Sequence, residues 1–419
     1  MATKRERPTI EVHLDAPDLV PFQQVGTLYR HEVRTDLAVP FVYTQSWLKQ
    51  ESAFLLDPRL DLWVGEQHPP YPASAFGIFL DSAPDRWGRV LMERREAASA
   101  EREQRPMRTL QELDFLLGVN DFTRMGALRF KEPHAAHYLD NSANAAPPVT
   151  DLRELASISR RIEEPGIERL PQYEQWLAML IAPGTSLGGA RPKANFRMPG
   201  DELWLAKFPA NDDRYDVGGW EFLVHQLAQR AGIWVPPARL EHLTDRHGTF
   251  CIARFDRRAG QRRMYASAMT MLERRDGEEG ASYLELALFL QDKGAQGHIG
   301  QDLEQLYRRV VFNVMVGNRD DHLRNHGFIR EPSGWRLSPA FDINPNLAKA
   351  DHSLTFDGKS AAPSLKLVKE TADFYRCEDR AEKIIDEVHM AVSIWHQEAE
   401  RIDLPSLEIK RMKSVFLQA

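Results

Sequence analysis

The sequence predicts an α+β protein built from more than one unit, and three observations support this prediction. The chain has 419 residues, more than one ordinary hydrophobic core usually organises. Strand-like and helical segments alternate from Ile10 to about Phe130, and again from Glu202 to Arg258. Beyond Ala266 the pattern is mainly helical. We therefore expect mixed structure first and a helical region last.

A small, polar and proline-bearing stretch from His134 to Thr150 indicates a linker or surface excursion. We place a domain boundary near Pro147. The expected organisation is a mixed N-terminal subdomain over residues 1–147, a second mixed unit over residues 148–265 and a helical unit over residues 266–419.

Composition narrows the class of protein. A hydrophobic content of 42% and a charged content of 27% are those of a soluble globular protein. The net charge of −7 argues against a large basic nucleic-acid surface on this chain alone. The two cysteines, Cys251 and Cys377, form no CxxC pair, which excludes a cysteine-based zinc site or a disulfide framework. Without an apolar signal core or membrane-length run, the sequence predicts a cytoplasmic protein.

Short patterns predict the individual elements. In the N-terminal part, four segments read as strands: PTIEVHL, GTLYRHE, LWVG and GALRF. A charged helix is expected after Ser82, its predicted cap. Further on, the sequence predicts strands at Glu202–Ala210 and Thr249–Arg258 and helices that end at Gly232 and Gly317.

The loop VGNRDDHLRNHGFI carries the densest group of polar side chains, and it supports two interpretations. In the first, Asp320, Asp321, His322 and His326 bind the metal of a hydrolase. No glutamate follows His322, however, as the zincin pattern requires. In the second interpretation, Asp320 and Asn325 have the spacing of the catalytic aspartate and metal-binding asparagine of a phosphotransferase.

The phosphotransferase interpretation predicts further residues. A second Mg²⁺ ligand should follow shortly, and Asp342 lies just past a hairpin expected around Pro332-Ser333-Gly334. Lys207, on a strand with apolar neighbours, is the candidate cation for the phosphates, and Glu221 is its candidate partner. The alternatives are a lysine that reaches to water and an acid that complements a helix dipole.

The stretch APGTSLGGARPKA is the candidate cover for the phosphates. Its glycines free the backbone to present N–H groups to phosphate oxygens, and Lys193 adds positive charge. A plain glycine-rich turn is the alternative. The expected nucleotide contacts here are Gly188, Gly189 and Ala190.

Together these segments resemble the HipA family of bacterial serine/threonine kinases, the toxins of HipA–HipB-type toxin–antitoxin pairs. The resemblance is carried by TSLGGARPKA, LWLAKFP, RFDRR, GNRDDHLRNHGF and FDINPN, in the family's order. It implies a two-lobed protein-kinase-like fold with an N-terminal α/β accessory subdomain and a mainly helical C-terminal lobe, and ATP with Mg²⁺ as cofactors.

The resemblance also implies roles for individual residues. Asp320 would be the catalytic aspartate, Asn325 and Asp342 the metal ligands, and Lys207 the nucleotide lysine. Further nucleotide contacts would come from Glu221, His322 and the adenine-lining segment at Arg254 and Phe255. Ser186, beside Thr185, would be the site of autophosphorylation that silences the enzyme.

The implied substrate is a translation-related protein, such as an aminoacyl-tRNA synthetase. The implied partner is a small helix-turn-helix antitoxin that would carry the complex onto DNA. Asp321 departs from better-known members, and we expect it either to bind extra metal or to be solvated. Two rival functions stay open: a non-catalytic kinase-fold scaffold, and a small-molecule phosphotransferase.

Overall fold

A computed structural model describes residues 9–30, 38–141, 146–162, 164, 166–181 and 191–416. Within it the chain divides into two compact units. The first comprises Met1–Leu205 with Asp256–Ala266, and the second comprises Ala206–Phe255 with Ser267–Ala419. The boundaries predicted at residues 147 and 265 stay predictions.

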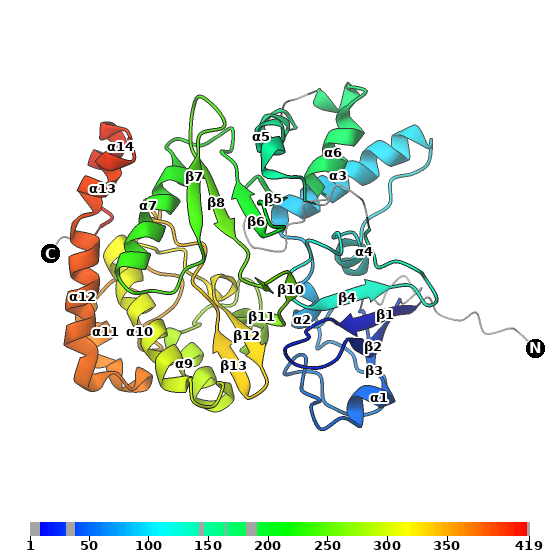
Figure 1. Cartoon of the computed structure of the whole chain (residues 1–419), viewed down its shortest axis with the longest axis horizontal. Coiled ribbons are helices and arrows are strands. Elements are labelled where there is room, and N and C mark those ends of the chain that lie inside the picture. Colours follow the sequence, from blue (N-terminus) through cyan, green and yellow to red (C-terminus); the bar gives the residue numbers. More distant parts are fainter. Residues whose placement is uncertain are drawn as a thin grey trace, which may run out of the picture. The chain divides into compact units, whose positions relative to one another are not determined.

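The first unit contains a four-stranded sheet in the order β3-β2-β1-β4 (Figure 1). Its strands pair antiparallel, with Val12 of β1 opposite Gly26 of β2 and Phe130 of β4. Val12 and Phe130 are fully buried. The elements of this unit are β1 (Thr9–Leu14), β2 (Gln23–Tyr29), β3 (Phe41–Tyr43), α1 (Gln45–Leu48), α2 (Gly77–Leu80), α3 (Arg86–Arg102), α4 (Glu112–Leu117), β4 (Leu128–Lys131), η1 (Val149–Asp151), α5 (Leu152–Arg161), η2 (Ile167–Arg169), α6 (Tyr173–Ile181), β5 (Lys193–Arg197), β9 (Arg257–Arg258) and β10 (Gln261–Arg262). Two strands begin in this unit and end in the second: β6 (Leu203–Lys207), whose last residue Lys207 belongs to the second unit, and β11 (Tyr265–Ser267).

Three of the four strands predicted in this part are present, and two details differ. The segment LWVG forms bends, and its side chains Leu62, Trp63 and Val64 are exposed. Its apolar residues therefore pack against no sheet. The helix cap is Asp85, because its Oδ1 accepts a hydrogen bond from Gly88 N at 2.9 Å, so the prediction of Ser82 was wrong.

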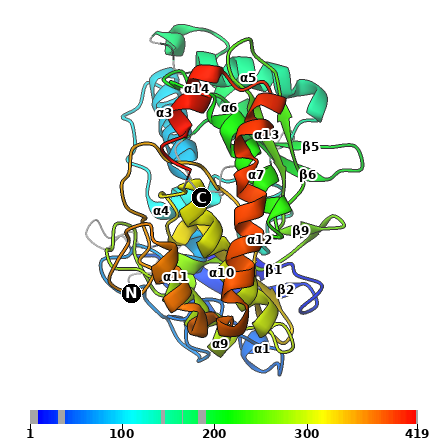
Figure 2. The ribbon, with the colours of Figure 1, turned by 90° about the vertical axis from the view of Figure 1, so that its left-hand side faces the viewer.

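The second unit is mainly helical (Figure 2), and its part beyond Ala266 agrees with the helical pattern expected there. The long helix α10 is buried along most of its length and packs against α9 and α12, while α12 and α13 also pack on α7. The elements are α7 (Val217–Arg230), β7 (Ala238–Glu241), β8 (Thr249–Ala253), α8 (Ala268–Met271), α9 (Tyr283–Lys293), α10 (Ile299–Val316), η3 (Leu323–Asn325), β12 (Gly327–Glu331), β13 (Gly334–Leu337), α11 (Leu365–Glu370), η4 (Ala372–Tyr375), η5 (Glu378–Arg380), α12 (Ala381–Ser393), α13 (Trp395–Arg401) and α14 (Ser406–Met412).

The elements that bear the predicted site residues follow the sequence patterns closely. Helix α10 ends at Gly317, whose φ of 64° is left-handed. The predicted hairpin is β12 and β13, with Phe328 opposite Leu337. The predicted strand Thr249–Arg258 is instead two shorter ones, β8 and β9, separated by a turn. Among the described residues, no helix is long and apolar enough to cross a membrane.

Candidate active site

Lys207 ends strand β6, and its ammonium group lies between two carboxylates. Its Nζ is 2.5 Å from Glu221 Oε1 and 2.6 Å from Asp342 Oδ1. Lys207 is buried, and burial works to lower its pKa. The charges of Asp342 and Glu221 outweigh burial and raise the pKa of Lys207 above its usual value. A lysine held this firmly stays charged, as a phosphate-binding residue must.

Glu221 comes from the first turns of α7, the helix that follows β6 along the chain. Its side chain is only 3% exposed. A carboxylate buried to this degree needs a cation, and Lys207 supplies it. The alternative of a lysine reaching to water is therefore wrong, and Glu221, in the first turns of α7, pairs with Lys207 whether or not it also complements the helix dipole.

Asp342 follows strand β13, and its backbone is in an unusual conformation. Its φ is +56°, a left-handed value that is uncommon outside glycine, asparagine and aspartate. Asn344 Nδ2 lies 3.4 Å from its Oδ1, and the side chain of Asp342 keeps 28% of its surface exposed. The conformation directs a carboxylate toward Lys207 while leaving part of it accessible.

Asp320 and Asn325 lie in the loop after α10. The side chain of Asp320 is 55% exposed and forms an ion pair with Lys349. Asn325 belongs to the short helix η3, and its Nδ2 donates to the backbone oxygen of Asp320 at 3.2 Å. The Oδ1 atom of Asn325 is buried and accepts no hydrogen bond from the described residues. A buried amide oxygen without a donor is costly unless a cation or water binds it.

These observations fit a Mg²⁺ ion. Asn325 supplies an orphaned amide oxygen, and Asp342 supplies a partly exposed carboxylate. Both are the oxygen ligands that Mg²⁺ prefers, and Mg²⁺ usually keeps several waters and contacts few protein groups. Asn325 and Asp342 therefore stay the predicted metal ligands.

Asp321, next to Asp320, is buried in a hydrogen-bond network. Its Oδ2 accepts from the Tyr283 hydroxyl at 2.7 Å and from Asn313 Nδ2 at 2.7 Å, and lies 2.8 Å from His326 Nε2. Burial works to raise the pKa of Asp321, but His326 and Tyr283 outweigh it and lower that pKa. Both expectations for Asp321, extra metal binding or solvation, are therefore wrong.

The same network excludes the hydrolase interpretation. His326 pairs with Asp321, and Asp320 forms an ion pair with Lys349. Within the ranges that the structure describes, no group of three or more His, Cys, Asp or Glu side chains is placed to hold a metal ion. Asp320, Asp321 and His326, three of the four side chains that a hydrolase would need on one ion, are thus divided between two separate environments.

The remaining predicted contacts are placed as follows. Phe255 follows strand β8 and stacks on Phe341 at 5.3 Å, directly before Asp342, and Arg254 is buried. His322 lies in the loop after α10 that also bears Asp320, and its backbone N–H donates to Asp320 O at 3.0 Å. The roles of Arg254, Phe255 and His322 stay predictions. Five predicted residues lie outside the described residues: Thr185, Ser186, Gly188, Gly189 and Ala190.

Lys193 does not have the position that the sequence suggested. Its side chain is 1% exposed and forms an ion pair with Asp85 within the first unit. The expectation that it adds charge to the phosphate cover was therefore wrong. Sequence reasoning also missed Lys349, because the stretch LAKADHS matches no spacing rule that would distinguish this lysine from a solvated one.

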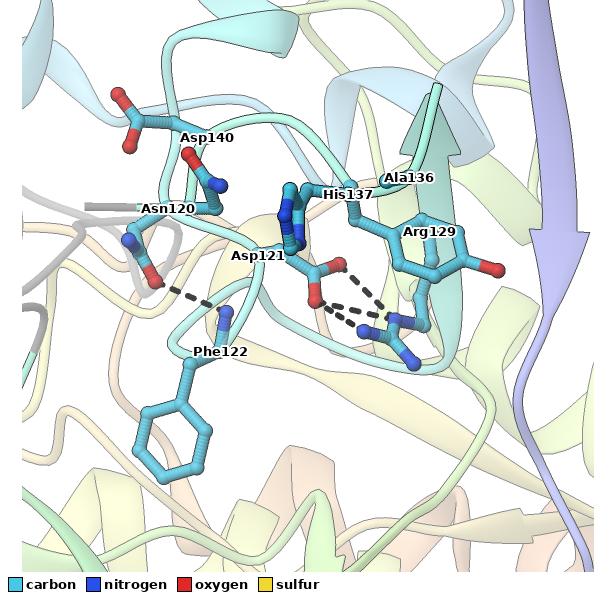
Figure 3. A pocket seen from close by; sticks show the side chains of 9 residues that line it. Asn120, Asp121, Phe122, Arg129, Ala136, His137 and Asp140 are labelled. Carbon is cyan, nitrogen blue, oxygen red and sulfur yellow. Dashed lines mark hydrogen bonds and ion pairs between the residues drawn. The ribbon is translucent and has the colours of Figure 1, made fainter. Parts of the chain in front are cut away.

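The first unit contains a separate polar pocket of about 270 Å³ (Figure 3). Its polar groups bind one another: Asp121 pairs with Arg129, and Asn120 Oδ1 accepts from Phe122 N at 2.9 Å. Arg129 also lies 3.9 Å from the centre of the Tyr138 ring. These side chains stabilise the β4 region, and nothing in the pocket specifies a ligand.

The second unit thus brings together Lys207, Glu221 and Asp342, the residues of the candidate active site whose contacts the structure shows. A family model described as the HipA-like C-terminal domain matches residues 185–395, half of the chain, and the chain belongs to this family. Two curated relatives are similar over shorter stretches. The serine/threonine-protein kinase toxin HipA of Shewanella oneidensis is 26% identical over 268 residues, 55% of this chain and 59% of that protein. A putative kinase of Haemophilus influenzae is 32% identical over 104 residues, 22% of this chain and 30% of that protein.

The chain therefore spans less than two thirds of the length of either relative. A solved structure confirms the fold over nearly the whole chain. It is the Shewanella oneidensis complex of HipA, HipB and operator DNA, with a TM-score of 0.62 and 18% identity, covering 97% of this chain and 94% of that chain. The predicted α+β, HipA-like fold is confirmed.

Proposed function

We propose that this protein is an ATP- and Mg²⁺-dependent serine/threonine protein kinase. The observation that carries the proposal is the buried Lys207–Glu221–Asp342 cluster, in one unit with Asp320 and Asn325. No packing requirement explains why three charged groups meet here. A site that binds a nucleoside triphosphate and a metal ion explains all three charged groups.

The roles follow from these positions. Asp320 accepts the proton of a serine or threonine hydroxyl while the oxygen of that hydroxyl bonds to the γ-phosphorus of ATP. The bond from that phosphorus to the bridging oxygen breaks, and ADP leaves. Lys207 offsets charge on the phosphates. When bound, Mg²⁺ at Asn325 and Asp342 supplies further charge neutralisation. Most of the rate enhancement in such a site comes from positioning and electrostatics.

We further propose autophosphorylation at Ser186. A phosphate carries roughly −1.5 to −2 charges at neutral pH. It would repel a bound triphosphate and so silence the enzyme. The substrate that we propose is a translation-related protein, and the location is the cytoplasm, where ATP is available.

A small helix-turn-helix antitoxin is the proposed partner. The similarity to a HipA that was solved with HipB and operator DNA supports it. The net charge of −7 favours DNA contact through such a partner over direct binding by this chain.

The test is intact mass after incubation with Mg²⁺ and ATP, for the native chain, Asp320→Ala and Ser186→Ala. We expect the native chain alone to gain one phosphate. A gain in Ser186→Ala as well would keep the kinase but move the acceptor, with Thr185 the first candidate. No gain from an unphosphorylated starting mass would overturn the proposal and favour the scaffold or the small-molecule phosphotransferase.

A further inference from the structure

Lys349 forms a direct ion pair with Asp320, the proposed catalytic aspartate. Lys349 lies shortly after Asp342 in the stretch FDINPNLAK. This stretch therefore carries the candidate metal ligand Asp342 at its start and the cation that pairs with Asp320 at its end. The same ammonium group donates to Ser353 Oγ at 3.0 Å. Among the described residues, Lys349 is the cation within ion-pair distance of Asp320.

The backbone around Lys349 is fastened to the loop that bears Asp320. Arg319 Nη1 donates to Lys349 O at 2.7 Å, and Ser353 N donates to Arg319 O at 3.0 Å. Asn346 N donates to Gly317 O at 2.9 Å, while its Oδ1 accepts from Lys349 N at 3.0 Å. These bonds fix the origin of the Lys349 side chain on both sides, so the pair with Asp320 is part of the loop's construction.

The ion pair contributes little to folding, because both side chains are about half exposed, 55% for Asp320 and 45% for Lys349. Exposed pairs of this kind contribute little to the stability of a protein, because solvent screens their attraction. A structural need therefore does not account for a segment fastened so closely to the loop. The pair is better explained by the reaction that Asp320 performs.

Phosphoryl transfer places Asp320 in an unfavourable electrostatic position. Its carboxylate must approach an acceptor hydroxyl that is bonding to a negatively charged phosphoryl group, and like charges at contact distance repel strongly. A fixed cation beside the carboxylate offsets this repulsion and holds one carboxylate orientation. Lysine suits this task, because its compact ammonium group has three donors that several oxygens can share.

We propose that Lys349 is a positioning residue of the phosphoryl-transfer site: it orients Asp320 and offsets the charge that collects there during transfer. This inference rests on the proposed kinase function. A rival role for Lys349 is an autoinhibitory contact that a substrate must displace. The hydrogen bonds at Arg319, Asn346 and Ser353 hold the segment in place, which favours the positioning role.

The experiment compares full-length native protein with Lys349→Met, Lys349→Arg and the control Lys366→Met. Lys366 is 87% exposed and pairs only weakly with Glu370 at 3.9 Å, so its substitution changes the net charge equally at a remote surface position. The rate of autophosphorylation is followed by intact mass across ATP concentrations. This gives a maximal rate and the ATP concentration for half of that rate.

We expect Lys349→Met to lower the maximal rate by about 10- to 100-fold, with the half-maximal ATP concentration within about twofold of the native value. Lys349→Arg should recover much of the rate, and Lys366→Met should match the native chain. The melting temperature should not change in any variant. A merely structural role would change melting and would not separate the rate from the ATP dependence.

The outcomes separate the two proposals. A native chain that transfers no phosphate overturns the proposed function and this inference together. An active native chain with an equally active Lys349→Met variant overturns only the inference. A faster Lys349→Met variant would also overturn it, in favour of the autoinhibitory contact.

Discussion

Lys207 and Asp342 lie 135 positions apart in the sequence, and their side chains form an ion pair of 2.6 Å. This contact joins the end of strand β6 to the loop after β13. Glu221 completes it from α7 at 2.5 Å. Three elements thus meet at one buried ammonium group, and this arrangement makes specific predictions about stability and activity.

Replacing Lys207 by Met should lower both stability and activity. The substitution leaves Glu221 buried without its cation, and breaking a buried pair in this way costs about 3–5 kcal/mol. The measurement is the free energy of unfolding in urea, together with phosphate transfer. The double variant Lys207→Met with Glu221→Gln is the control, because it should regain most of the stability and none of the activity. Equal stability of the two variants would contradict the proposed pairing.

Replacing Asp321 by Asn should destabilise the loop that carries Asp320. The oxygen keeps its three hydrogen-bonding neighbours but loses its charge, and we expect a loss of about 1–3 kcal/mol. Phosphate transfer should also slow, because Asp320 is the adjacent residue. Tyr283→Phe removes one neighbour only and should cost about 1 kcal/mol. If Asp321→Asn unfolds at the same urea concentration as the native chain, the network does not anchor the loop.

His352 should make stability depend on pH. Burial lowers the pKa of His352 to about 4 from an ordinary value of 6.5. As the pH falls from about 6.5 to about 4, the unfolded chain binds a proton that the folded chain excludes, so stability is lost. The full effect is roughly 3 kcal/mol. The measurement is unfolding free energy at pH 7 and pH 4–5 for the native chain and His352→Gln. Between these pH values the variant should lose distinctly less unfolding free energy than the native chain. Equal losses in the two proteins would refute this role of His352.

Replacing Gly317 by Ala should destabilise the end of α10. Gly317 has a left-handed φ of 64°, and an added Cβ would lie 2.4 Å from Val415 Cγ1 and 2.8 Å from Val415 O. The conformation and the clash together should cost about 2–4 kcal/mol. Gly358→Ala is the matched control, because Gly358 has a φ of 80° with nothing within 4 Å of the added atom. Equal losses in the two variants would show that the contact with Val415 is unimportant.

Local patterns were enough to predict several elements of the fold. The spacing of apolar residues and the terminal glycine predicted α10 and its end at Gly317, and turn residues predicted the β12–β13 hairpin. These features depend on neighbours within a few positions, which the sequence shows directly. The same reasoning failed for LWVG, because alternation creates a strand only where a partner strand is available.

The candidate site divides in the same way. The residue types and their spacing are visible in the sequence, and they indicated five candidate site residues: Lys207, Glu221, Asp320, Asn325 and Asp342. The pairing of Lys207 with Glu221, 14 positions away, was predicted. Spacing could not show that the same ammonium group also pairs with Asp342, since a contact across 135 positions depends on how strands and helices pack. Spacing also could not predict the environment of Asp321, for which both expectations, metal binding and solvation, were wrong.

The sequence by itself determined the order of the elements and predicted the class of chemistry that we propose, because propensity, periodicity and motif spacing are local properties. Only the tertiary structure decided which charges are paired. It buried Asp321 among Tyr283, Asn313 and His326, left Asp320 exposed, and placed Lys349 against it. Burial and pairing set the energy of a charged group, and both depend on residues that are distant in the sequence.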